Sequence, residues 1–455
     1  MSKEAALRAG HWRNWSGSVR SHPREVILPT SVDELAQRVA AINRAGRHLR
    51  VVGAGHSFTP LVGTDDTLIS LDRMQGIIRA DEAAGTVTAL GGTRLFRLGP
   101  DLQARGVAQE NLGDINQQSI AGAISTGTHG TGAGFGSIAT QVEGLTLVTA
   151  TGEVLECSRT QNAEIFDAAR VSLGALGVIA AVTLRVVPAK RVRLVTRRER
   201  LSHMLEHLEA YKRDNSHFEF YWFPYTDGGQ TKFVNETDDA ASGGELWANF
   251  NKIVLENGAL WVFSKASQLI PPLAPTICKI SLAGITPLNE VNSSHLIYAT
   301  PRMVRFQEME YSIPADQFTT VMGEVQARIK QGKYKVNFPI ECRFVRGDDL
   351  WLSTAYGRDS AYIAAHMFRG MPYKDYFAGL EEIFTRYGGR PHWGKHHTRD
   401  AAYLAAHYPR WADFQRVRAT LDPNGVFLND YLRHLFGVDA EVNAAARLTT
   451  TNVEA

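Results

Sequence analysis

The chain has 455 residues, which is too long for one ordinary hydrophobic core, so two domains are expected. Hydrophobic residues make up 44% and charged residues 21%, as in soluble globular proteins, and a net charge of +2 gives no reason to expect a nucleic-acid partner. The three cysteines, Cys157, Cys278 and Cys342, are widely spaced, which argues against a disulfide framework and suits a reducing compartment.

The N-terminal third predicts alternating helices and strands. Residues 1–15 contain no apolar core of signal-peptide length, so we expect a cytoplasmic protein. A helix is expected within residues 30–46, where Ser31 and Glu34 form a capping box at its start and Gly46 ends it. The next predicted elements are strands at 48–52, 67–74 and 85–92 and a short helix at 95–106.

A stretch rich in glycine and hydroxyl residues runs from Ser119 to Ser137. An apolar lead-in opens it, and strands with a hairpin turn at 150–153 follow it, so a flexible linker explains it poorly. Glycine lets the main chain approach a ligand, and serine and threonine hydroxyls can donate to phosphate. The stretch therefore indicates a phosphate-binding loop.

The second half of the chain has less distinctive patterns. The basic run at 190–200 indicates a solvated strand edge at a domain junction. The apolar segment at 260–284 is interrupted by lysines and prolines, which favours a buried or interfacial segment over membrane contact. A helix is expected at 319–332 and a strand at 334–345.

The segment from Leu49 to Pro60, LRVVGAGHSFTP, begins as a strand and continues into a glycine turn. A dinucleotide-binding fold carries three glycines in such a turn, but here Phe58 occupies the third position and Pro60 stands where a helix should already run. Asp72, after the next predicted strand, lies at the distance of a ribose ligand and keeps that fold open as an alternative.

The same turn suits a different device, in which backbone N–H groups face phosphate oxygens while His56 presents its imidazole to the ligand. A neutral imidazole is a nucleophile that can attack a flavin methyl group and tether the cofactor, although a hydrogen-bonded turn histidine is the simpler alternative. Together with the stretch from Ser119 to Ser137, the turn predicts a large two-phosphate cofactor such as FAD.

The chain resembles the flavoproteins of the vanillyl-alcohol-oxidase type, in particular the branch of L-gulono-1,4-lactone and D-arabinono-1,4-lactone oxidases, with alditol oxidases nearby. The resemblance covers about residues 12–435. It rests on seven motifs in family order: VVGAGHSF, NLGDINQQSIAGAISTGTHGTG, SLGALGVI, FYWFPYTD, IECRFVRGDDLWLSTAYGRDS, GGRPHWGKHH and LDPNGVFLNDYL.

The expected architecture is α+β, with a two-subdomain FAD-binding domain and a cap (substrate) domain that carries an antiparallel sheet over the flavin. We expect the FAD-binding domain over residues 1–188 and the cap domain over 189–397. Residues 398–440 should return to the FAD-binding domain, and 441–455 should form a frayed tail.

The resemblance also implies roles for individual residues. His56 matches the histidine that bonds covalently to the flavin 8α-methyl group in many members, Ile179 a backbone contact on the adenine side, and His392 a residue near the flavin. The residues that match the loops around the pyrophosphate and the flavin are Gly53, Ala54, Gly55, Ser57, Phe58, Gly113, Asp114, Ser119, Gly122, Ser125, Thr126, Gly127 and Thr128.

Three charged residues match the substrate end of the family's site: Glu341, Arg343 and Lys395. Glu341 and Arg343 are two residues apart in a strand-like run, so both lie on one face and Cys342 lies on the other. By their residue types alone, a structural ion pair is an equally good explanation.

A metal site is not expected. Lys395 stands near His392, His396 and His397, but no carboxylate or cysteine joins these histidines locally.

The implied reaction is the oxidation of a secondary alcohol of a sugar lactone, in which a hydride passes to the flavin and the hydroxyl proton is lost. Arg343 and Lys395 would stabilise the negative charge on the oxygen, and Glu341 would orient the substrate. Lys395 is also a candidate base, because a neighbouring arginine would lower the pKa of its ammonium group.

Gly113 matches the position at which related dehydrogenases carry a residue that blocks oxygen, so its hydrogen side chain predicts an oxidase that reacts with O2 and releases hydrogen peroxide. Asp114 departs from the small or hydroxyl residue common in relatives, which leaves a polyol substrate open. A dehydrogenase with another acceptor, and a nucleotide-binding or metal-assisted protein without flavin, also stay open. No membrane partner is expected.

Overall fold

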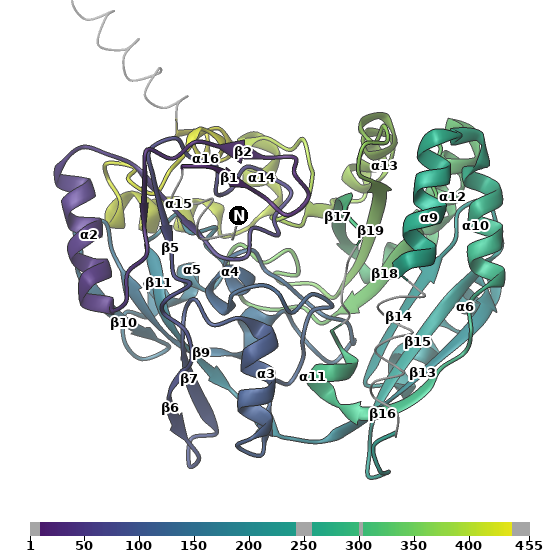
Figure 1. The fold of residues 1–455 in the computed structure, drawn as a ribbon, viewed down its shortest axis with the longest axis horizontal. Coiled ribbons are helices and arrows are strands. Elements are labelled where there is room, and N and C mark those ends of the chain that lie inside the picture. Colours follow the sequence, from purple (N-terminus) through teal and green to yellow (C-terminus); the bar gives the residue numbers. More distant parts are fainter. Residues whose placement is uncertain (1–9, 243–256, 300–303, 439–455) are drawn as a thin grey trace, which may run out of the picture.

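The computed structural model describes residues 10–242, 257–299 and 304–438. Two lobes lie side by side (Figure 1): one contains the N-terminal and C-terminal segments, and the other contains the middle of the chain. The predicted tail at 441–455 lies outside the described residues. The mixed helix and sheet content and the antiparallel sheets confirm the predicted α+β class.

The first lobe begins with a small parallel sheet that carries the glycine turn at its edge. Its strands lie in the order β3 (Glu25–Ile27), β5 (Thr67–Ser70), β4 (Leu49–Val52). Helix α2 (Val32–Arg44) joins β3 to β4. The Ser31 hydroxyl accepts a hydrogen bond from Glu34 N as predicted, but the Glu34 carboxylate accepts from Thr30 N and not from Ser31 N. The reciprocal arm of the capping box therefore lies one residue earlier than expected.

The dinucleotide-binding alternative is wrong. Between β4 and β5 the chain forms the glycine turn and no helix, whereas that fold requires a helix directly after the turn. Asp72, its candidate ribose ligand, forms an ion pair with Arg94.

A second, antiparallel sheet forms the core of the first lobe, with the strand order β10-β9-β11-β7-β6. The predicted hairpin turn at 150–153 is confirmed, because Val148 pairs with Val154 and Gly152 between them has a φ of +84°. The elements are β6 (Ile77–Asp81), β7 (Thr86–Leu90), α3 (Leu95–Gln103), α4 (Ile120–Ser125), η1 (Ile138–Gln141), β9 (Val142–Val148), β10 (Val154–Ser158), α5 (Ala163–Ala169) and β11 (Val178–Arg185).

Two pairs of very short strands complete this lobe: β1 (Trp12–Arg13) with β2 (Arg20–Ser21), and β8 (Val107–Ala108) with β12 (Val187–Pro188). The glycine-rich stretch begins with helix α4 and is not a loop throughout, because Ile120, Ala123 and Ile124 bury one side of that helix in the core.

The second lobe is built on an eight-stranded antiparallel sheet in the order β16-β13-β15-β14-β18-β19-β17-β20. The strands are β13 (Arg191–Arg200), β14 (His217–Trp222), β15 (Gly228–Thr237), β16 (Asn289–Ser293), β17 (Phe306–Pro314), β18 (Ile340–Val345), β19 (Ser360–Phe368) and β20 (Arg390–Pro391). The helices are α6 (Leu201–Glu206), α7 (Leu208–Asp214), α9 (Asn257–Leu269), η3 (Pro271–Leu273), α10 (Ala274–Ala283), α11 (Ser294–Ile297), η4 (Ala315–Gln317), α12 (Phe318–Gly332) and α13 (Lys374–Arg386).

The two faces of this sheet differ in chemistry because side chains alternate along each strand. One face is apolar and packs on α12 and α13, through residues such as Phe220, Cys342 and Ile363. The opposite face carries charged side chains in register: Glu219 faces Arg343, Tyr221 faces Glu341, and Glu308 faces His366. The predicted opposition of Cys342 to its charged neighbours is confirmed.

One prediction for this lobe needs correction. The basic run forms β13, which is an interior strand and not an edge, because it pairs with β15 on one side and β16 on the other. The apolar segment forms α9, η3 and α10 and is buried only in part: Trp261 is 51% exposed and Leu269 is 79% exposed. Among the described residues, no helix is long and apolar enough to cross a bilayer.

The C-terminal helices α14 (Ala401–His407), α15 (Trp411–Leu421) and α16 (Asp430–Phe436) pack in the core of the first lobe. The C-terminal segment thus returns to the first lobe. The buried Arg50 guanidinium on β4 holds it there, because it donates to the carbonyl oxygen of Phe427 as well as to those of Leu61, Leu173 and Gly174. The exact domain boundaries at 188, 397 and 440 stay predictions.

Candidate active site

The glycine turn lies in the wall of a cavity of the first lobe, which we call the glycine-lined cavity. Residues from 50–62, 118–126 and 173–179 border it. A Cβ atom at position 53 would lie 2.3 Å from Ser119 Oγ, so Gly53 lets the two predicted loops meet. Gly55 has a φ of +73°, which glycine adopts without strain.

The turn presents free backbone donors to this cavity. Within the described part of the chain, no group accepts a hydrogen bond from the backbone N–H of Ala54, Gly55 or Ser57. Successive unpaired N–H groups in a concave turn are suited to bind phosphate. These residues therefore fit a cofactor with a pyrophosphate, as FAD has.

The hydroxyls expected to assist them are already engaged. Ser125 Oγ donates to the carbonyl oxygen of Ala121 at 2.7 Å, and Thr126 Oγ1 donates to that of Gly122 at 3.2 Å. Such bonds are common for hydroxyl residues in helices. In this arrangement the main chain, rather than these two hydroxyls, offers donors to a phosphate.

His56 lies where the glycine-lined cavity meets a second one, which we call the charged cavity. Both cavities are lined by His56, Ser57, Gln118 and Thr126. The His56 imidazole stacks on Trp15, with the ring centroids 5.4 Å apart. A ligand that fills the first cavity can therefore extend past His56 into the second.

The structure gathers nearly all of the predicted cofactor ligands around these two spaces. The glycine-lined cavity is bordered by Gly53, Ala54, Gly55, Ser119, Gly122, Ser125, Thr126 and Ile179. The charged cavity is bordered by Phe58, Gly113, Asp114, Thr128 and His392. Gly127 borders neither, and its φ of +68° instead forms the turn after α4.

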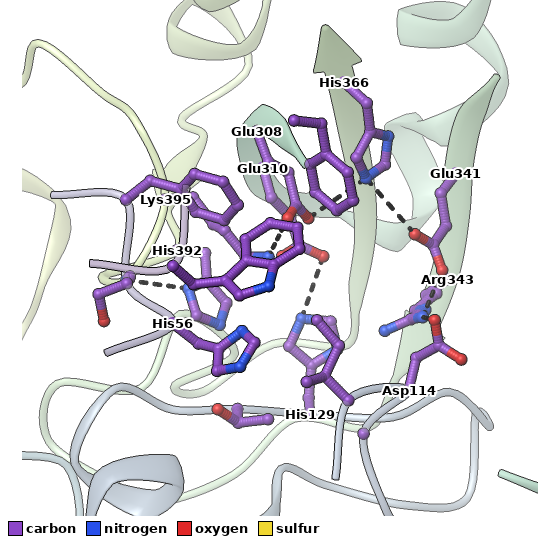
Figure 2. Close-up of a pocket in the computed structure, with 18 of the residues that line it drawn as sticks. His56, Asp114, His129, Glu308, Glu310, Glu341, Arg343, His366, His392 and Lys395 are labelled. Carbon is purple, nitrogen blue, oxygen red and sulfur yellow. Dashed lines mark hydrogen bonds and ion pairs between the residues drawn. The ribbon is translucent and has the colours of Figure 1, made fainter. Parts of the chain in front are cut away.

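Arg343 lies on the polar sheet face that forms one wall of the charged cavity (Figure 2). Its guanidinium forms an ion pair with Glu341, and its Nε donates to Glu219 Oε2 at 3.0 Å. Asp114 Oδ2 lies 4.0 Å from the guanidinium. The Tyr221 hydroxyl donates to Glu341 Oε1 at 2.8 Å. The predicted pair of Glu341 and Arg343 thus belongs to a larger network.

This network keeps Arg343 and Glu219 charged. Burial alone would lower the pKa of Arg343, but the carboxylates of Glu341 and Glu219 raise it well above its ordinary value. Burial would raise the pKa of Glu219, but Lys232 and Arg343 outweigh it and lower that pKa. A charged guanidinium therefore stays fixed beside the cavity.

Lys395 reaches the same cavity from the segment after β20. Its ammonium forms an ion pair with Glu308 Oε2 and lies 5.1 Å from the centroid of the Phe58 ring. Burial would raise the pKa of Glu308, but Lys395 and then His366 outweigh burial and lower it to about 2. The Glu308 carboxylate holds the ammonium at the cavity wall, which supports a charge-stabilising role for Lys395.

A buried cluster of His129, Glu310 and His392 was not foreseen, and its ligand atoms lie within 4.8 Å of one another, as a metal site would require. His129 faces an oxygen at each ring nitrogen, Gly130 O at 2.9 Å from Nδ1 and Glu310 Oε1 at 3.3 Å from Nε2, so both nitrogens have partners within the protein.

His392 completes this cluster as a neutral ring. Its Nδ1 accepts from Gly394 N at 3.0 Å, and burial lowers its pKa to about 3, so the proton is on Nε2. His396 and His397 point elsewhere, to Gln307 and Tyr431. The three side chains therefore form a buried, hydrogen-bonded cluster beside the cavity.

The cavity and network residues that escaped the sequence analysis include His129, Glu219, Glu308, Glu310 and His366. A signal existed for some of them. The segment FQEMEYSIP alternates charged and apolar residues, as HFEFYW does in part, and a sheet with both faces covered places such charges in its interior. The contacts of His129 and His366 had no such signal.

Comparisons with known proteins show which family the chain belongs to. Residues 182–435 match the family described as D-arabinono-1,4-lactone oxidase, and residues 23–158 match the FAD binding domain. The L-gulono-1,4-lactone dehydrogenase of Mycobacterium tuberculosis is 41% identical over 94% of this chain and 99% of that protein. The L-gulonolactone oxidase of Bos taurus is 33% identical over 93% of this chain and 98% of that protein.

The fold has known counterparts as well. The crystal structure of cholesterol oxidase from Brevibacterium sterolicum superposes with a TM-score of 0.79 at 18% identity, covering 94% of this chain and 96% of that one. At this identity the likeness concerns the fold alone. The family match extends over more than half of the chain, so the chain belongs to the D-arabinono-1,4-lactone oxidase family.

Proposed function

We propose that this protein is an FAD-linked oxidoreductase that oxidises a secondary alcohol of an aldono-1,4-lactone of the L-gulono, L-galactono or D-arabinono type. The observation that carries the proposal is the junction at His56 of a cavity with free backbone donors and a cavity with fixed positive charges. The two named relatives that cover this chain almost completely act, by their names, on the same class of lactone.

The residues of the glycine-lined cavity would hold the FAD, with its pyrophosphate on the turn at 53–57 and its ring system beside His56. When bound, the flavin supplies a two-electron acceptor for the carbinol hydrogen. The chain's own task is to bind the lactone, orient its C–H bond and stabilise the charge on its oxygen.

Two cationic side chains, Arg343 and Lys395, are positioned to stabilise the negative charge on the substrate oxygen. As the hydroxyl proton leaves, negative charge grows on the substrate oxygen, and Arg343 and Lys395 both line the cavity with their charges held by carboxylate partners. Fixed donors of this kind typically contribute about 100- to 1000-fold in rate. Glu341, held by Arg343 and Tyr221, would accept a hydrogen bond from a substrate hydroxyl and fix its orientation.

We further propose that the flavin is attached covalently through His56. Acid precipitation of the purified protein should leave the yellow colour in the pellet, and intact mass should include the added FAD. In His56→Ala the colour should move to the supernatant. A colourless wild-type pellet with a yellow supernatant would refute the attachment while leaving FAD as a bound cofactor.

The fate of the electrons separates two candidate functions. Gly113 borders the charged cavity, which supports access of O2 and release of hydrogen peroxide. The Mycobacterium tuberculosis relative, however, is named a dehydrogenase, which favours another acceptor. Anaerobic reduction followed by air distinguishes them: an oxidase should regain its yellow colour within seconds, and a dehydrogenase should stay bleached for minutes.

The Gly113→Ala variant tests whether the absence of a side chain at position 113 gives O2 access to the flavin. Its added Cβ would lie 3.0 Å from Thr128 Cγ2 and 3.3 Å from His129 O, inside the cavity wall. We expect slower reoxidation by O2 with unchanged reduction by lactone. A panel that includes alditols, read by peroxide or by dye reduction, then tests the alternative of an alditol oxidase.

A further inference from the structure

The loop that joins β1 to β2, residues 14–19 with the sequence NWSGSV, lies against the turn that carries His56, and the proposed chemistry gives it no task. Three carbonyl oxygens of this turn accept hydrogen bonds from the loop. The bonds are Trp15 N to Gly55 O at 2.7 Å, Asn14 Nδ2 to Ser57 O at 3.0 Å, and Ser18 Oγ to Phe58 O at 3.1 Å. The loop therefore holds the main chain on both sides of His56.

The loop has a defined shape because Asn14 bonds it from within. Asn14 is 2% exposed, and its Oδ1 accepts from Gly17 N at 2.9 Å and from Val19 N at 3.0 Å. Gly17 has a φ of +81°, which glycine adopts without strain. One side chain thus shapes the loop through Oδ1 and ties it to the turn through Nδ2.

The loop presents the Trp15 ring to His56. The two rings stack, with centroids 5.4 Å apart and planes 23° apart. The edges of the Trp15 ring meet Phe58 and Phe306, with centroids 6.3 and 5.1 Å away. Both phenylalanines are buried, so the indole is held at its edges while one face covers the imidazole. The imidazole can turn only by leaving this stack.

We propose that Trp15, held in place by Asn14, is a positioning residue for the covalent attachment of FAD to His56. This inference rests on the proposed attachment. In that step a ring nitrogen of His56 forms a bond to the flavin 8α carbon, while a C–H bond of that methyl group and the ring N–H bond break and two protons leave. The electron pair of the C–H bond passes by way of the flavin to O2, which becomes hydrogen peroxide.

Positioning matters for this step because bond formation requires the nitrogen lone pair to be aimed at the carbon at short range. His56 is only half-buried, so its imidazole would otherwise sample several rotamers. The hydrogen bonds from the loop fix the main chain at His56, and the stack on Trp15 restricts the rotation of the ring. Trp15 therefore acts through His56 and takes no part in bond making itself.

The test uses full-length apoprotein from riboflavin-starved cells, to which FAD is added in air. Quenching of FAD fluorescence at early times gives the dissociation constant, and timed acid precipitation gives the rate of covalent attachment at saturating FAD. In Trp15→Leu this rate should fall about 10- to 100-fold, as expected for a misplaced reacting group, while the dissociation constant changes less than about threefold.

Trp15→Phe keeps a planar ring in the stack and should retain at least about a third of the wild-type rate. The matched control is Trp261→Leu, which removes a tryptophan that is 51% exposed on α9 of the other lobe, and it should change neither quantity. If Trp15→Leu does not fold, Trp15→Met fills more of the space without a planar ring and makes the same comparison.

Attachment at the wild-type rate in Trp15→Leu would overturn the inference alone. A parallel loss of FAD binding would also overturn it, because Trp15 would then belong to the binding wall. A wild-type protein that binds FAD but never retains it in the acid pellet would overturn the proposed attachment together with this inference. Reduction of the bound flavin by lactone tests the proposed oxidoreductase separately, so these failures are distinguishable.

Discussion

The ion pair of Glu308 with Lys395 makes a prediction that requires no knowledge of the substrate. In Glu308→Gln the shape is kept, but the ammonium loses its carboxylate partner. The pKa of Glu308 falls from an ordinary 4.5 to about 2 on folding. At about 1.4 kcal/mol for each pKa unit, this corresponds to about 3 kcal/mol of stability.

The sign of the pH dependence follows from the lowered pKa. The contribution is complete above pH 4.5 and is lost as the pH falls towards 2. At pH 3.5 the unfolded carboxyl group is mostly protonated, so about 1.4 kcal/mol should already be lost. The glutamine variant should therefore be less stable than wild type at pH 7 by about 3 kcal/mol, and the gap should narrow by about 1.4 kcal/mol at pH 3.5.

Urea unfolding at a series of pH values, followed by tryptophan fluorescence, measures this gap. Glu209→Gln is the matched control, because Glu209 pairs with Lys212 at 2.8 Å but is 77% exposed. Such a surface pair should contribute less than about 1 kcal/mol at any pH. Parallel pH profiles for wild type and Glu308→Gln would refute the reasoning, since they would show that no buried carboxylate titrates there.

Three further outcomes are expected. Arg343→Met should slow anaerobic flavin reduction by about 100- to 1000-fold, measured by stopped flow, and a smaller loss would remove Arg343 from charge stabilisation. Gly91→Ala should lower bound FAD and the melting temperature, because its Cβ would lie 2.2 Å from Ile179 O, whereas Gly134→Ala meets nothing within 4 Å and should change neither. His392→Gln should leave the pH dependence of the flavin-reduction rate between pH 5 and 9 unchanged, because the pKa of His392 is lowered to about 3. The loss of an inflection of that pH profile in the variant would contradict a neutral His392.

The sequence predicted the elements whose causes are local. Ser31 and Gly46 delimit α2 because a capping hydroxyl and a left-handed glycine act within a few residues. The alternation of Glu341, Cys342 and Arg343 identified a strand with one charged face. The errors arose where a distant segment determines the position of an element in the sheet. β13 was expected at a sheet edge, but β16, about 100 residues later in the chain, pairs with its second side.

The amino-acid sequence alone determined the glycine turn, the histidine within it, and the strand whose charged residues lie on one face. These features depend only on local backbone conformation and on the two-residue period of side chains along a strand. Only the tertiary structure decided which charges meet. Arg343 bonds to Glu219, which lies 124 residues earlier in the chain, and Lys395 pairs with Glu308 on β17. Both contacts depend on the strand order of the large sheet, which no local sequence pattern encodes. Burial makes these pairings selective, because a charged side chain removed from water is strongly destabilising unless an opposite charge lies beside it in the folded protein.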